Sequence, residues 1–174
     1  MMKKGQTWIS AVLYTALGII LITIILNSGI PLLNKIKDRN LVIQTKEMLH
    51  IMDENIRSVA LEGPGSKRFL SPVSIERGEL IIEENNNLLR WKLETKNKMM
   101  EPNIIFDEGA LKQFLNETIT EGEYIVNLEV EYEGVAEISL ISDLENPFTG
   151  TYSMTIEHNG TYISNKPIIV ISMR

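Results

Sequence analysis

A run of uncharged residues near the N-terminus constrains the fold of this chain more than any other feature. The run covers residues 8–26 and is dominated by isoleucine and leucine. As an α-helix it is about 30 Å long, close to the hydrocarbon thickness of a bilayer. A helix also satisfies its own backbone hydrogen bonds where water is absent. With Trp8 suited to the interface, the run predicts a membrane-inserting helix.

A cleaved secretory signal and a buried core helix are the alternatives for such a run. The run exceeds the roughly 7–15 apolar residues of a signal peptide, and residues 27–31 form a poor cleavage site. A core helix of a soluble protein carries polar positions along one face. This segment has only the scattered Ser10, Thr15 and Thr23. We therefore expect the helix to be retained.

A second helix pattern follows over residues 31–62. Gly29 and Pro31 predict a loosened or kinked helix, or a new helix that begins at Pro31. Apolar residues then recur in steps of three and four, with Thr45 filling one step. The stripe consists of Val42, Leu49, Met52, Ile56 and Val59. Gly63 and Pro64 are typical of the end of a helix, so the pattern predicts an amphipathic stalk.

The net charge and its distribution along the chain limit which classes of molecule can be its binding partners. The net charge is -6, and only Lys3 and Lys4 are charged before residue 35. Such an acidic balance argues against nucleic acid as a partner, because phosphate binding needs a concentrated basic face. A basic cluster of Lys35, Lys37 and Arg39 is either a solvated helix face or a contact with lipid headgroups or acidic residues of a neighbouring subunit.

From residue 69 onward the apolar period changes to that of β-strands. Residues 79–83 and 88–94 flank three asparagines, which is a strong hairpin signal. A second hairpin is predicted around Asn159-Gly160, and a short helix over residues 107–116 with Asp107 as its cap. Seven or eight short strands point to an antiparallel sandwich or barrel, so the expected fold class is α+β.

No arrangement of residues predicts catalysis. The chain has no cysteine, and His50 and His158 are its only histidines. The acidic pairs Glu83-Glu84 and Asp107-Glu108 lack the spacing of a calcium loop. No glycine-rich phosphate loop or serine elbow occurs. We therefore expect no enzyme activity, no catalytic residue, no metal and no cofactor.

The distribution of charge leaves the membrane topology open. Lys and Arg flank the apolar run on both sides, and a bare count places the C-terminal part inside. Two sequons, at Asn116 and Asn159, instead favour an exterior location for that part, as possible N-glycosylation sites.

The leader carries a resemblance to a known family. Lys3, Lys4, Gly5 and Gln6 stand directly before the apolar helix. This arrangement resembles the class III signal peptide of archaeal type IV pilins and archaellins. The resemblance implies that a prepilin-type peptidase cuts between Gly5 and Gln6, and that the retained helix becomes the filament core. Many pilins carry glutamate at the fifth mature position, where this chain has Ser10.

The sequence thus predicts a leader over residues 1–5 and a transmembrane or filament-core helix over 6–30. An amphipathic stalk (31–62), a linker (63–68) and an extracellular β domain (69–174) follow. The resemblance implies a membrane-inserted precursor, then a cell-surface filament. Its implied partners are further copies of the chain in a helical homo-oligomer, the peptidase and a pilus assembly platform. The alternative is a single-pass membrane protein whose β domain binds the cell envelope or a surface motor.

Overall fold

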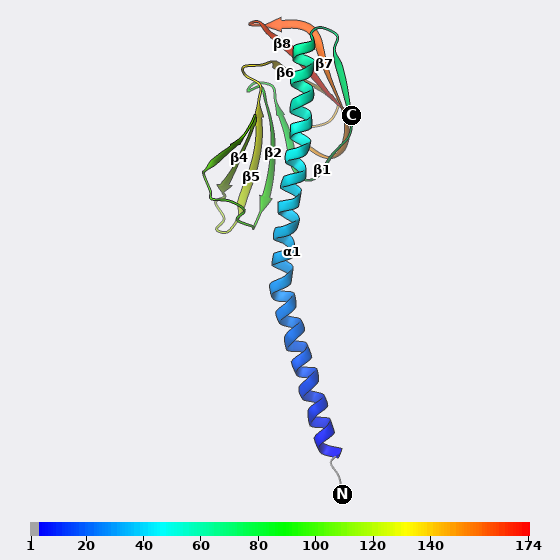
Figure 1. Cartoon of the computed structure of the whole chain (residues 1–174), viewed down its shortest axis with the longest axis vertical. Helices are drawn as coiled ribbons and strands as arrows, with labels where there is room; N and C mark the ends of the chain where they lie inside the picture. The colour runs from blue at the N-terminus through cyan, green and yellow to red at the C-terminus, as the bar shows by residue number, and fades with distance from the viewer. Residues whose placement is uncertain (1–3) are drawn as a thin grey trace. The chain divides into compact units, whose positions relative to one another are not determined.

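The computed structural model describes the backbone of residues 4–174 and the side chains from Trp8 onward. One helix, α1 (Lys4–Glu62), precedes eight strands (Figure 1). The strands are β1 (Lys67–Glu83), β2 (Leu88–Thr95), β3 (Ile105–Glu108), β4 (Leu111–Glu117), β5 (Tyr124–Glu131), β6 (Glu137–Ser142), β7 (Phe148–Ile163) and β8 (Lys166–Met173). The chain divides into two compact units, residues 1–38 and 39–174.

The described part of the first unit is helical throughout. Pro31 lies inside α1, so no new helix begins there. The helix accommodates it because proline removes only one backbone donor, although this costs stability in water. The apolar stretch therefore continues into the amphipathic part as one helix in its hydrogen-bonding pattern.

The second unit contains one curled sheet of eight strands, in the order β3-β4-β5-β2-β1-β7-β8-β6 (Figure 1). All neighbouring strands are antiparallel except β6 and β8, which are parallel. The α+β prediction is confirmed, but the sheet is a half-barrel rather than a sandwich. A curled sheet can surround its own core, and here the helix residues from 39 onward complete that core.

The predicted apolar stripe of the helix lies in this core. Leu49, Ile56 and Val59 are fully buried, and Thr45, which fills the missing step, is also buried. They belong to the same cluster as Trp91 and the inward-facing residues of the strands. The stripe thus packs within its own chain, as expected of an amphipathic helix beside a sheet.

The short helix predicted over residues 107–116 is wrong. Residues 105–117 instead form the hairpin of β3 and β4, with Glu108 paired to Leu111. Leu111 and Leu115 are both fully buried. Their spacing of four places them on one face of a helix, but equally on one face of a strand, so periodicity could not separate the two. Gly109, at φ +65°, makes the turn.

The hairpin predicted at Asn159-Gly160 is also wrong, whereas the one at residues 85–87 is confirmed. Glu83 pairs with Leu88 across that confirmed turn. At Asn159 the strand β7 continues through an irregularity in its pairing with β8. The chain turns later, at Ser164 and Asn165, which both have positive φ, as a tight two-residue hairpin requires.

Candidate membrane-inserting helix

The proposed cleavage site lies at the limit of the structure. Lys3 is outside the described residues, and Lys4, Gly5 and Gln6 are described only as helical backbone. Ser10, at the position where many pilins have glutamate, is exposed on the helix.

Beyond the leader, the apolar helix has no covering within the described chain. Its most apolar window of 18 residues has a mean hydropathy of 2.6 and is 0% buried. Trp8 is 76% exposed, Ile25 67% and Leu33 56%. By length and composition this helix fits a membrane span or a signal sequence. So much exposed apolar surface is unfavourable in water.

The polar side chains within this helix are compatible with that environment. The Thr15 hydroxyl donates a hydrogen bond to the Ala11 carbonyl oxygen at 2.9 Å, and Thr23 bonds to Ile19 in the same way at 2.8 Å. Each hydroxyl thus has a partner four residues earlier, and no water is needed to satisfy it.

Both sequon asparagines are accessible on the β domain. Asn116 is exposed near the end of β4, and Asn159 is exposed within β7. The Asn159 Oδ1 atom accepts the Thr161 backbone N–H at 2.8 Å, and the Thr118 hydroxyl donates to the Thr120 carbonyl oxygen at 3.0 Å. The two sites therefore differ locally but share exposure of the asparagine.

Three of the four residues in the acidic pairs considered as catalytic or calcium-binding groups, Glu83, Glu84 and Glu108, have structural partners. Glu83 pairs with Arg90 at 2.8 Å, and Glu84 accepts the Leu140 backbone N–H at 2.7 Å. Glu108 forms an ion pair with Lys46, and the hydrogen bond and positive charge of Lys46 lower the pKa of that carboxyl. Among the described residues, no three His, Asp or Glu side chains are placed to hold a metal ion.

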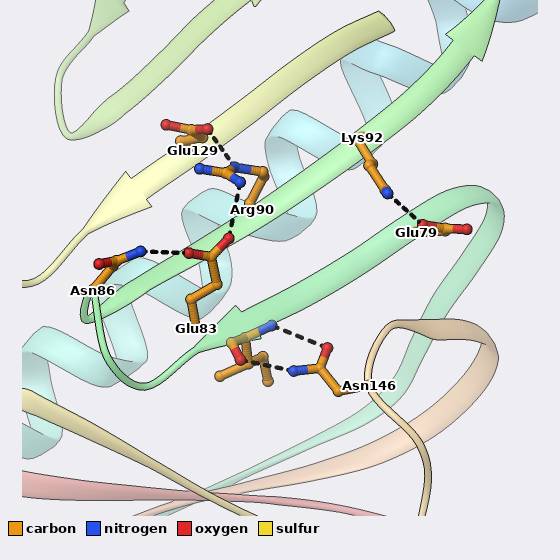
Figure 2. A network of polar contacts seen from close by, with 8 residues as sticks. Glu79, Glu83, Asn86, Arg90, Lys92, Glu129 and Asn146 are labelled. Carbon is orange, nitrogen blue, oxygen red and sulfur yellow. Dashed lines mark hydrogen bonds and ion pairs between the residues drawn. The ribbon is translucent and has the colours of Figure 1, made fainter.

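A polar network covers the outer face of the sheet at β1, β2 and β5 (Figure 2). Figure 2 shows Arg90 reaching Glu83 on one side and Glu129 on the other, while Lys92 pairs with Glu79 at 3.0 Å. Asn146 donates to the Ile82 carbonyl oxygen at 2.8 Å. Such cross-strand charge pairs stabilise the sheet.

The two histidines lie in different surroundings. His158 is buried, and its Nδ1 atom accepts the Gly160 backbone N–H at 3.0 Å. Its ring packs edge-on against Tyr162, with ring centroids 5.3 Å apart. His50 lines a shallow surface groove beside Glu54 and Glu108. Neither histidine has a nucleophile within hydrogen-bonding distance in the part of the chain described.

Fold and helix together define the class: an N-terminal helix apolar enough for membrane insertion, followed by a β-rich domain. This layout is consistent with that of pilin-like proteins. No protein-family model matches the chain, and neither a curated protein nor a solved structure is significantly similar to it.

Proposed function

We propose that the chain is a structural subunit of an archaeal cell-surface filament of the type IV pilus kind, assembled through its N-terminal helix. The observation that carries the proposal is the contrast between the two parts of the chain. The sheet and residues 39–62 enclose a complete apolar core. The helix between residues 8 and 33 exposes nearly all of its large apolar side chains.

Assembly of such helices has a physical basis. Before assembly, lipid surrounds the apolar side chains of the helix. In a filament they would instead pack against the same segment of other copies, with the β domains outside. Because lipid tails are as apolar as the helix, close packing and release of lipid would drive this step rather than exclusion of water. The precursor is thus membrane-inserted, and the assembled form lies at the cell surface.

Processing at the leader is the most direct test. Cleavage between Gly5 and Gln6 would remove both lysines and retain the helix. Mass spectrometry of the native protein should find Gln6 as its first residue. Replacing Gly5→Phe should leave the chain at precursor mass and abolish filaments, because a bulky side chain obstructs the protease cleft.

Gly29→Ala is the matched control for that variant. A Cβ at Gly29 has no heavy atom within 4 Å, so this variant should mature normally. A native chain that begins at Met1 or Met2 would refute the pilin-like processing. Unchanged mobility and filament yield in the Gly5→Phe variant would refute it as well.

The second candidate is a single-pass membrane protein whose β domain binds the cell envelope or a surface motor. The closed core of the β domain supports it, since such a domain needs only an anchor. Electron microscopy of sheared surface material distinguishes the two, because an anchored monomer would give no filaments that contain this chain. Either protein can be N-glycosylated at Asn116 and Asn159, and an unchanged mass after both are replaced would remove that modification.

A further inference from the structure

The outward side of the helix in the β-rich unit carries two stripes of identical spacing. The basic stripe consists of Arg39, Ile43 and Lys46, and the acidic stripe consists of Glu47, Ile51 and Glu54. In each, the second and third residues follow the first by four and seven positions, so each stripe lies along one side of the helix. Each residue of the acidic stripe lies eight positions after the corresponding residue of the basic stripe. The charges are opposite, and both stripes have isoleucine at the centre.

The central isoleucines are exposed, unlike the buried stripe on the other side of the helix. Ile43 is 53% exposed and Ile51 46%, whereas Leu49, between them in sequence, is fully buried. A groove of about 490 Å³ contains both isoleucines together with Lys46, Glu47 and Glu54. His50 and Glu108 complete its lining. The groove therefore contains the whole acidic stripe and two residues of the basic one, so this part of the helix surface is hollowed rather than flat.

Three of the four charges on these stripes have no ion-pair partner in the part of the chain that the structure describes. Arg39, Glu47 and Glu54 form no ion pair among the described residues, whereas Lys46 pairs with Glu108 of β3. On the sheet, by contrast, acids and bases are paired across strands, as at Arg90 and Lys92. The helix thus presents unpaired positive charge on one side and unpaired negative charge on the next.

We propose that these stripes bind each other between parallel copies of the chain, one copy shifted by eight residues along the helix. This single shift, about 12 Å, places Arg39 against Glu47 of a second copy and Ile43 against its Ile51. The same shift places Lys46 against its Glu54. The inference rests on the proposed self-assembly and adds a register to it.

The arrangement favours an open series of copies over a closed pair. Eight residues correspond to a rotation of about 80° beyond two full turns, so the two stripes lie on different sides of the helix. An interface between two different surfaces is heterologous, and it repeats indefinitely where the rotation does not close a ring. Exposed ion pairs contribute little each and weaken in salt. The stripes therefore set the register while the apolar helices provide most of the association.

Disulfide trapping tests the register, because the native chain contains no cysteine. The full-length Ile43→Cys/Ile51→Cys variant is oxidised in the membranes and filaments of producing cells. Two cysteines eight residues apart on one helix lie too far apart for a disulfide within one chain. The contact therefore predicts a ladder of dimers, trimers and longer multimers, whereas each single-cysteine variant should stay monomeric.

One further variant and one further measurement make each outcome decisive. Arg39→Cys/Glu47→Cys repeats the register test at a second pair, and electron microscopy of the same preparations reports on filament assembly independently of the register. A ladder from either double variant supports the stagger. Filaments that give only monomers from both double variants would overturn the stagger and leave the filament proposal intact. Loss of all crosslinks together with the absence of filaments would contradict both proposals. Dimers from single-cysteine variants would indicate a symmetric contact instead.

A charge exchange tests the electrostatic part. Arg39→Glu and Glu47→Arg should each lower the ladder several-fold in the Ile43→Cys/Ile51→Cys background, and their combination should restore it. Glu121→Arg, on an exposed loop, is the matched control and should have no effect. Equal losses in the single variants without recovery in the double would show that charge pairing does not set the register.

Discussion

The Oδ1 atom of Asn87 accepts the backbone N–H of Ile138 at 2.8 Å. Ile138 lies in β6, an edge strand whose only neighbouring strand is β8. The Asn87 side-chain amide also donates to the Glu137 carboxylate at 2.6 Å, and the Asn87 backbone carbonyl oxygen accepts the Tyr132 backbone N–H at 2.8 Å. One buried turn residue thus caps an open sheet edge that would otherwise offer unpaired backbone groups to other chains.

Replacing Asn87→Ala should destabilise the β domain by about 2–3 kcal/mol. The Ile138 N–H would lose its acceptor in a buried place, and alanine would have to adopt the positive φ of +49°. Thermal unfolding of the full chain in mild detergent, followed by circular dichroism of the β signal, measures the change. Asn86→Ala is the control, because Asn86 makes only an exposed bond to Glu83, and it should change stability by less than about 0.5 kcal/mol.

Gly78 should tolerate no side chain. A Cβ there would lie 2.5 Å from the Lys92 carbonyl oxygen and 2.8 Å from the Trp91 indole, at φ +79°. Steric overlap and backbone strain together predict a loss of about 3 kcal/mol for Gly78→Ala. Gly109→Ala has a similar φ of +65° but open space around it, so it should cost only about 1 kcal/mol. Equal losses in the same unfolding assay would contradict the close approach at Gly78.

Alanine substitutions at Leu49 and at Ile51 should have opposite effects: the first should lower folding stability, and the second should lower filament assembly. Leu49→Ala leaves a cavity in the core and should cost about 2–5 kcal/mol of folding free energy. Ile51→Ala removes an exposed side chain, so the unfolding temperature should barely change. If the stagger holds, filament yield should fall in Ile51→Ala while folding is intact. A clear loss of stability in that variant would place Ile51 in the core instead.

Alkaline pH should destabilise the β domain through Tyr132. Burial raises the pKa of the Tyr132 hydroxyl well above its usual value near 10, the Asp53 charge adds to this, and Arg57 opposes it. Above about pH 10 the unfolded chain releases this proton first, so stability falls as pH rises further. Tyr132→Phe should therefore lose less stability above about pH 10 than the unmodified chain does. Tyr162→Phe, which changes an exposed tyrosine, should lose as much as the unmodified chain. Unfolding temperatures between pH 8 and pH 11 measure the difference.

Local patterns predicted several elements correctly because neighbouring residues alone produce them. The apolar stripe of the helix appears as a 3.6-residue period, and all of its members are buried. The asparagine turn between β1 and β2 was predicted because asparagine tolerates positive φ, as Asn87 does. The predicted cleavage site between Gly5 and Gln6 stays a prediction. Lys3 lies outside the described residues, and only the exposed apolar helix that follows the site is described.

Elements that depend on distant partners were not predictable in the same way. Leu111 and Leu115 fit a helix and a strand equally, and pairing with β5 decides for the strand. Asn159-Gly160 has a favourable turn sequence, yet β7 continues through it because β8 pairs along both sides of that point. Sequence alone also contains no sign that β6 runs parallel to β8.

Three features follow from local sequence pattern: an apolar helix, an amphipathic continuation and a β-rich remainder. These follow from composition and period over a few turns, which need no knowledge of contacts. Which side of the amphipathic helix packs against the sheet, by contrast, is seen only in the folded chain. The stripe containing Leu49 lies inside the core, which leaves the Ile43 and Ile51 side as the exposed surface. Which side of the helix is buried and which is exposed depends on packing against strands that are distant in sequence, so a local pattern cannot predict it.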